Sequence, residues 1–247
     1  MLAYTQKGEG KTIVFLHGFL ESSSMWHFLP LSELNAHLLF IDLPGHGNSP
    51  LEDHQAEPSI AFMAEEVSKI LAHEKITLFD IVGHSMGAYV ALCVKEKHPE
   101  CGKVVLLNSN FWDDNEQKKK ERLRVAEIAI KAKQIFINEA IPNLFGNTEP
   151  YWEIIQELKT EANQLSPESI AYAALAMRVR KDFTPEVHAH FKSYFVIHGI
   201  LDRLVDVATL QHRFPFSEQT FLIEDVGHMA HIEASEKVME ILKQILR

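Results

Sequence analysis

The 247-residue chain has few cysteines, little positive charge and no long hydrophobic run. Cys93 and Cys101 are too few for a disulfide framework, which predicts two reduced thiols and a cytoplasmic protein. Residues 1–11 contain no apolar stretch of the kind found in signal peptides. The longest apolar runs have the length of a β-strand, so we expect no transmembrane helix and no membrane partner.

The charge balance argues against a nucleic-acid-binding protein, and the motifs argue against a metal-binding protein. Lys and Arg number 24 against 34 Asp and Glu, a net charge of -10, whereas a phosphate-binding surface needs clustered positive charge. We therefore expect no nucleic-acid partner.

The fourteen histidines include no H-E-x-x-H motif and accompany no cysteine pair, so scattered surface histidines are favoured over a metal site. Glu121 interrupts the basic run 118–124, and Glu116 and Glu127 lie close to its ends, which predicts a solvated helix face.

Short apolar runs alternate with helical patterns along most of the chain. Continuous apolar runs predict buried parallel strands at 12–17, 38–42, 77–83, 103–108, 193–199 and 220–224. Apolar residues at helical spacing predict amphipathic helices over 60–71 and 238–246. This alternation predicts an α/β fold with a mostly parallel central sheet and helices on both faces.

One section contains helical patterns but no convincing strand. We interpret residues 111–183 as a helical cap inserted into a core made of residues 1–110 and 184–247. Ser166 followed by Pro167 is typical of a helix N-cap with proline at the first helical position. Aromatic residues and methionines in this section could hold the cap together or line a partly apolar pocket. The sequence does not separate these roles for Trp112, Phe136, Phe145, Tyr151, Trp152, Met177 and Phe183.

The strongest motif is G-x-S-x-G, formed by residues 83–87 with the sequence GHSMG. A strand pattern precedes it and a helix pattern follows it, which is the context of a nucleophile elbow. Gly83 and Gly87 fit this interpretation, because a tight turn brings the helix close to the strand and leaves no room for side chains. The motif predicts that Ser85 is a nucleophile rather than a helix cap.

A serine nucleophile needs a base and an acid from elsewhere in the chain. His228 follows the last predicted strand and can reach the carboxyl edge of the sheet, whereas His231 would turn away if a helix has begun. Asp202 lies in the loop after the strand at 193–199. Asp206 is an alternative that would fall in the next helix, and Asp225 is too close in sequence to His228. The order Ser85, Asp202, His228 is that of α/β-hydrolases.

An oxyanion hole needs two backbone N–H groups directed at the developing negative charge. Met86, directly after the proposed nucleophile, would supply one. Phe19, in the loop after the strand at 12–17, would supply the other, because Gly18 allows the backbone to turn inward. We interpret His17 as a residue that braces this loop.

These motifs together resemble the α/β-hydrolase superfamily, in its small, capped, esterase and haloperoxidase-like branch. The matching segments are HGF (17–19), DLPGHGNS (42–49), GHSMG (83–87), GILD (199–202) and GHMAHIE (227–233). The resemblance implies that residues 42–49 form a structural turn. A related lyase of the menaquinone pathway has an arginine four residues after the nucleophile, where this chain has Tyr89, so an anionic substrate would lose a bidentate contact.

We therefore predict a serine hydrolase that cleaves a small, partly apolar ester or related carbonyl compound through an acyl-enzyme on Ser85. Such chemistry needs no cofactor. The same three residues would also serve a C–C bond hydrolase, a lactonase or a lyase, and a non-catalytic ligand receptor is a further alternative. The sequence leaves the substrate and the oligomeric state open.

Overall fold

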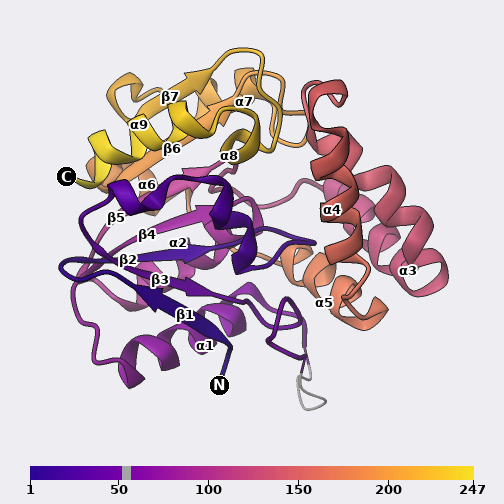
Figure 1. The fold of residues 1–247 in the computed structure, drawn as a ribbon, viewed down its shortest axis with the longest axis horizontal. Helices are drawn as coiled ribbons and strands as arrows, with labels where there is room; N and C mark the ends of the chain where they lie inside the picture. Colours follow the sequence, from indigo (N-terminus) through magenta and orange to yellow (C-terminus); the bar gives the residue numbers. More distant parts are fainter. Residues whose placement is uncertain (52–56) are drawn as a thin grey trace.

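A single mixed sheet forms the centre of the molecule (Figure 1). The computed structural model describes residues 1–51 and 57–247. Its strands lie in the order β1-β3-β2-β4-β5-β6-β7. Only the β1–β3 pair is antiparallel among the described strands, which confirms the mostly parallel sheet. The strands are β1 (Tyr4–Lys7), β2 (Thr12–Leu16), β3 (His37–Ile41), β4 (Phe79–His84), β5 (Cys101–Leu107), β6 (Tyr194–Gly199) and β7 (Thr220–Ile223).

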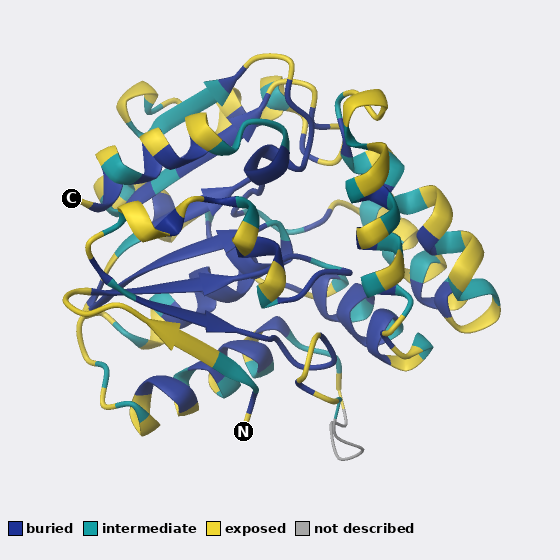
Figure 2. Cartoon of the chain, in the orientation of Figure 1, coloured by how far each residue is buried: buried dark blue, intermediate teal, exposed yellow. Residues whose placement is uncertain are grey.

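Strand β1 is absent from the sequence-based prediction. Three of its four residues are exposed, because it lies at the edge of the sheet (Figure 2). Its sequence YTQK therefore lacks the continuous apolar character by which buried strands are recognised. The other six strands lie at the predicted runs, although the run at 77–83 becomes a strand only from Phe79.

Helices cover both faces of the sheet, as predicted. They are α1 (Ile60–His73), α2 (Met86–Lys97), α3 (Glu116–Ala140), α4 (Trp152–Ala162), α5 (Pro167–Arg178), α6 (Thr184–Ala189), α7 (Val207–Arg213), α8 (Ala230–Glu233) and α9 (Ser235–Leu246). Short 3₁₀ helices are η1 (Ser23–Phe28), η2 (Leu31–Glu33), η3 (Pro142–Leu144), η4 (Glu149–Tyr151), η5 (Phe191–Ser193) and η6 (Ser217–Gln219). No helix in the described ranges has both the length and the apolar character needed to cross a membrane.

Alternate residues of each central strand enter different cores. In β2, Val14 and Leu16 pack with apolar residues of α1 and α2, whereas Ile13 and Phe15 pack with those of η1 and α9. This alternation follows from the strand geometry, in which successive side chains point to opposite faces. The continuous apolar runs in the sequence are thus explained by burial on both faces.

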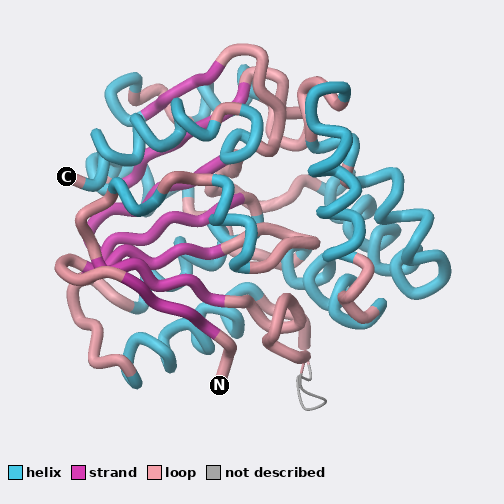
Figure 3. The backbone as a smooth tube through the Cα atoms, in the orientation of Figure 1, coloured by secondary structure: helices cyan, strands magenta, loops and turns pink. Residues whose placement is uncertain are grey.

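The section 111–183 contains α3, α4 and α5 and no strand, as the sequence predicted. These helices lie together beyond one end of the strands, on the right of Figures 1 and 3. A third apolar cluster joins them to the sheet domain, since it includes Phe145 and Ile155 together with Leu20 and Met229. The predicted cap at Ser166 is confirmed, because its side chain accepts a hydrogen bond from the backbone N–H of Ser169 at 3.0 Å.

Candidate active site

Ser85 occupies a strained turn between β4 and α2. Its backbone angles are φ 48° and ψ -113°, and a positive φ is costly for a residue with a side chain. A Cβ at Gly83 would lie 2.5 Å from the nitrogen of Ala88, and one at Gly87 would lie 2.4 Å from the carbonyl oxygen of Leu16. Both contacts are with backbone atoms, so the prediction that side chains are excluded at both glycines is confirmed.

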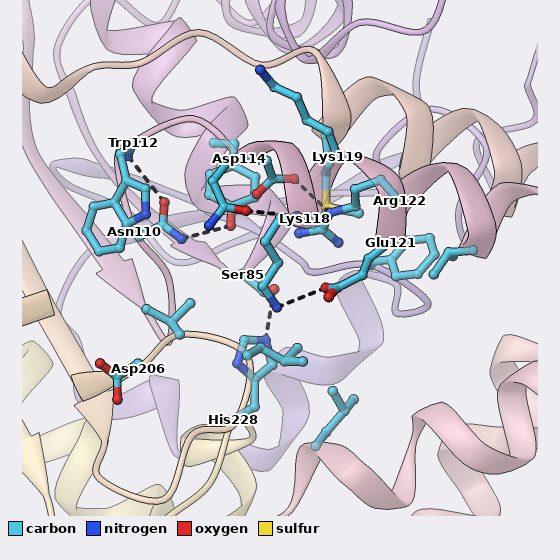
Figure 4. A pocket seen from close by; sticks show the side chains of 18 of the residues that line it. Ser85, Asn110, Trp112, Asp114, Lys118, Lys119, Glu121, Arg122, Asp206 and His228 are labelled. Atoms are coloured by element: carbon cyan, nitrogen blue, oxygen red, sulfur yellow. Dashed lines mark hydrogen bonds and ion pairs between the residues drawn. The ribbon is translucent and has the colours of Figure 1, made fainter. Parts of the chain in front are cut away.

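The structure brings Ser85, His228 and Asp202 together at the carboxyl end of the sheet. His228 Nε2 lies 2.8 Å from Ser85 Oγ, and His228 Nδ1 lies 2.7 Å from Asp202 Oδ2. Figure 4 shows the serine and the histidine facing each other across the floor of a cavity. The side chains come from three separate loops, which follow β4, β6 and β7.

The hydrogen bonds define the protonation of the histidine. Asp202 is a buried acceptor, so the proton of the neutral imidazole lies on Nδ1 and Nε2 can accept the proton of Ser85. Burial alone would raise the pKa of Asp202, but the electrostatic attraction and the hydrogen bond between its carboxylate and the His228 ring outweigh burial and lower the pKa. Asp202 Oδ1 accepts from the N–H groups of Leu204 and Val205, at 2.8 and 3.1 Å, and these bonds fix the carboxylate plane.

The alternative partners lie elsewhere. His231 is in α8, which begins at Ala230, and its ring is fully buried without a hydrogen-bond partner among the described residues. It is therefore a packing residue. Asp206 is the N-cap of α7 and accepts from the N–H of Thr209 at 2.8 Å. Asp225 is exposed, in a turn with φ 59°.

The two backbone amides expected to bind an oxyanion remain available. Met86 is the first residue of α2, where helical N–H groups have no intrahelical acceptor. Within the described residues, no hydrogen bond engages the N–H of Met86 or Phe19. His17 contacts the loop as predicted, since its Nδ1 bonds to the carbonyl of Gly18 at 2.8 Å and its Nε2 accepts from the N–H of Leu43 at 2.9 Å.

A cavity of about 810 Å³ opens above Ser85 and His228. Of the residues singled out in the helical section, Trp112, Phe136 and Met177 line it. Phe145 and Phe183 are instead buried in the apolar clusters. Tyr151 packs against one of these clusters, while Trp152 is 62% exposed.

The basic segment is largely solvated, as the sequence predicted, since four of the residues 118–124 are exposed and none is buried, but two of its side chains also face the cavity. Lys118 and Arg122 line the cavity and are only partly exposed (Figure 4). Lys118 pairs with Glu121 at 3.3 Å, and Arg122 pairs with the buried Asp114 at 3.1 Å. Spacing on α3 could not reveal this environment, because the cavity is formed by elements distant in sequence.

The remaining sequence predictions concern cysteines, metals and one turn. Cys93 and Cys101 are free and buried. In residues 1–51 and 57–247, no group of His, Cys, Asp or Glu side chains has the arrangement needed to hold a metal ion. The turn at 42–49 is held by Asp42, whose carboxylate accepts from the N–H groups of Ser23 and Asn48, both at 2.8 Å.

A family model described as the alpha/beta hydrolase family matches residues 13–241. The chain belongs to this family. It is 27% identical to a pimeloyl-[acyl-carrier protein] methyl ester esterase of Aeromonas hydrophila over 257 residues, covering 97% of this chain and 96% of that protein. It is 26% identical to a 2-succinyl-6-hydroxy-2,4-cyclohexadiene-1-carboxylate synthase of Enterobacter over 249 residues, covering 95% and 91%.

Solved structures of hydrolases are similar over the whole chain. A thermophilic esterase from Thermogutta terrifontis, solved with malate bound, has a TM-score of 0.88 at 25% identity and covers 100% of this chain and 93% of that one. An enol-lactonase from Burkholderia xenovorans has a TM-score of 0.84 at 20% identity, covering 99% and 96%, and shows the fold alone. These structures agree with the alpha/beta hydrolase fold of this chain.

Sequence reasoning did not identify three polar residues beside the candidate site. Asn108 donates from Nδ2 to Asp202 Oδ2 at 3.2 Å and to the carbonyl of Gly227 at 2.9 Å. Glu21 and His84 form a buried pair at 2.8 Å. The sequence offered a signal only for two of them, since Glu21 lies two residues after HGF and His84 lies within G-x-S-x-G, whereas Asn108 directly follows β5 and is next to neither motif.

Proposed function

We propose that the protein is a serine esterase that hydrolyses a small carboxylic ester through an acyl-enzyme on Ser85. The hydrogen-bonded series Ser85–His228–Asp202, at 2.8 and 2.7 Å under an 810 Å³ cavity, carries this proposal. The esterases among the relatives support it. Tyr89 in place of an arginine favours hydrolysis of an ester over the lyase reaction.

The proposed reaction uses only groups of this chain and water. Ser85 Oγ attacks the ester carbonyl carbon while His228 Nε2 accepts its proton. The N–H groups of Phe19 and Met86 hold the resulting oxyanion. When the carbon–oxygen bond of the ester breaks, His228 gives its proton to the departing alcohol.

The second half of the reaction repeats these roles with water. His228 removes a proton from water as the water attacks the acyl carbon, and the bond to Ser85 Oγ then breaks with return of the proton. Asp202 orients the imidazole and stabilises its positive charge in both halves. The helical section 111–183 would act as a cap that encloses the acyl or alcohol group of the substrate.

The test is hydrolysis of p-nitrophenyl acetate and butyrate by the wild-type protein and by Ser85→Ala. We expect turnover only in the wild type, and labelling of Ser85 by a fluorophosphonate probe only in the wild type. Retained turnover in folded Ser85→Ala would refute the proposed nucleophile. Labelling without any ester turnover would favour a lyase, and absence of labelling would favour a ligand receptor.

A further inference from the structure

Two charged side chains lie beside the proposed catalytic residues without taking part in the reaction described above. Glu21, 5% exposed, lies two residues after Phe19, and His84, 1% exposed, directly precedes Ser85. Glu21 Oε2 accepts from the N–H of Gly18 at 2.7 Å and from His84 Nδ1 at 2.8 Å. Both side chains line the same cavity as Ser85.

The contacts of His84 define its charge. Its Nδ1 faces a carboxylate oxygen of Glu21 and its Nε2 faces the carbonyl oxygen of His228 at 3.0 Å. With Glu21 ionised both atoms are acceptors, so both ring nitrogens carry a proton and His84 is an imidazolium. Burial lowers the pKa of His84, but Glu21 outweighs burial and the pKa is raised. Burial would raise the pKa of Glu21, but His84 outweighs it and the pKa falls to about 2.

The pair connects three segments that are far apart in sequence. Glu21 binds the loop that carries the N–H of Phe19, and His84 is part of the serine turn. The second N–H of His84 reaches the backbone of His228. These segments are closely packed at Gly18. A Cβ at this position would lie 2.4 Å from Glu21 Oε2 and 2.7 Å from His84 Nδ1.

Stability alone gives no reason for such a pair. Removing two charges from water costs as much free energy as their attraction returns, and apolar residues of similar volume stabilise a core equally well or better. The second oxygen of Glu21, Oε1, is buried without a hydrogen-bond partner among the described residues, which adds to the cost. The neighbouring His231 ring, 4.9 Å from that of His84 between ring centres, is held neutral by burial and lacks polar partners of its own in the described chain.

We propose that Glu21 and His84 are positioning residues for ester hydrolysis: they hold the oxyanion-binding loop and the backbone of the general base in register with Ser85. The inference rests on the proposed function. Through its hydrogen bond with the N–H of Gly18, Glu21 fixes the direction of the Phe19 N–H. Through its hydrogen bond with the carbonyl oxygen of His228, His84 fixes the position of the His228 backbone relative to Ser85. A displacement of about 1 Å at either group would lower kcat by about 10²-fold.

The decisive variant is the double substitution Glu21→Leu/His84→Phe, which replaces the pair by apolar side chains of similar size. We expect the variant to fold, with a melting temperature lowered only by loss of the acceptor for the buried Gly18 N–H, while kcat for p-nitrophenyl butyrate falls about 10²-fold and KM changes less than about 3-fold. Glu21→Gln is the conservative variant. Its amide oxygen can still accept from Gly18 and His84, so we expect kcat within about 10-fold of the wild type.

Asp80→Asn is the matched control. Asp80 is also a buried carboxylate that accepts a backbone N–H, from Lys103 at 2.8 Å, and pairs with a cation, Lys11. It lies near the opposite end of β4. We expect Asp80→Asn to lower the melting temperature with kcat unchanged. Wild-type kcat in the folded double variant, or an equal loss of kcat in the control, would overturn the positioning role.

The same experiment separates this inference from the proposed function. If the wild type hydrolyses esters and the double variant does so equally well, the positioning role fails and the esterase proposal stands. If the wild type is labelled by the fluorophosphonate but hydrolyses no ester, the esterase proposal fails. In that case the labelling rate of Ser85 replaces kcat, and an equal rate in the double variant overturns the positioning role.

Discussion

Replacing Asp202 by asparagine tests the proposed triad with the smallest change in shape. The aspartate Oδ1 accepts two backbone N–H groups, from Leu204 and Val205, and Oδ2 accepts from His228 and Asn108. An asparagine has one acceptor oxygen for these two sets of donors. It must place its NH₂ group either against the two backbone N–H groups or against the imidazole.

The first orientation leaves the buried N–H of Val205 and the part-buried N–H of Leu204 without this acceptor, which costs about 1–3 kcal/mol for the buried donor. The second orientation removes one acceptor of Asn108, whose amide keeps its 2.9 Å bond to the carbonyl of Gly227, so this orientation is favoured. It forces the imidazole of His228 to place its proton on Nε2. A protonated Nε2 faces Ser85 Oγ at 2.8 Å and cannot accept the hydroxyl proton. In serine proteases the same change of tautomer lowers kcat by about 10⁴-fold, equivalent to about 5.5 kcal/mol of transition-state stabilisation.

The assay is p-nitrophenyl butyrate hydrolysis by Asp202→Asn at neutral pH, with Ser85→Ala as the background rate. Thermal unfolding must show that the variant is folded. A loss of kcat smaller than about 10-fold would refute the reasoning. It would mean that His228 carries its proton on Nδ1 even without a carboxylate at residue 202.

The other predictions concern packing, thiols and pH. Gly87→Ala places a Cβ 2.4 Å from the carbonyl oxygen of Leu16, so urea unfolding should show a loss of about 1–3 kcal/mol and the esterase rate should fall as the turn shifts. Cys93 and Cys101 are buried, and burial raises the pKa of each thiol to about 12, so a disulfide reagent should titrate neither thiol in native protein and both in guanidinium. The pKa of Glu21 falls from 4.5 to about 2 on folding, so its charge contributes stability above pH 4.5 that is lost as the pH falls toward 2. The unfolding free energies of the wild type and Glu21→Gln should therefore converge over this range, and a constant difference would contradict the assigned charge.

The sequence alone was sufficient for the fold class and for the identity of the proposed nucleophile. Buried parallel strands are recognisable because both faces must be apolar, and the serine turn is recognisable because Gly83 and Gly87 are required by backbone contacts. The same rule explains the failure at β1, whose edge position allows polar side chains.

Only the tertiary structure decided which side chains meet. Placement in the chain favoured His228 over His231, but the reason is that α8 begins at Ala230 and turns His231 into the core. The contacts of Glu21 with His84 left no pattern in the sequence, because they join a loop to the end of β4, 63 residues away. Periodicity reports how a residue relates to its own strand or helix, whereas a hydrogen bond between loops depends on how whole elements pack against one another.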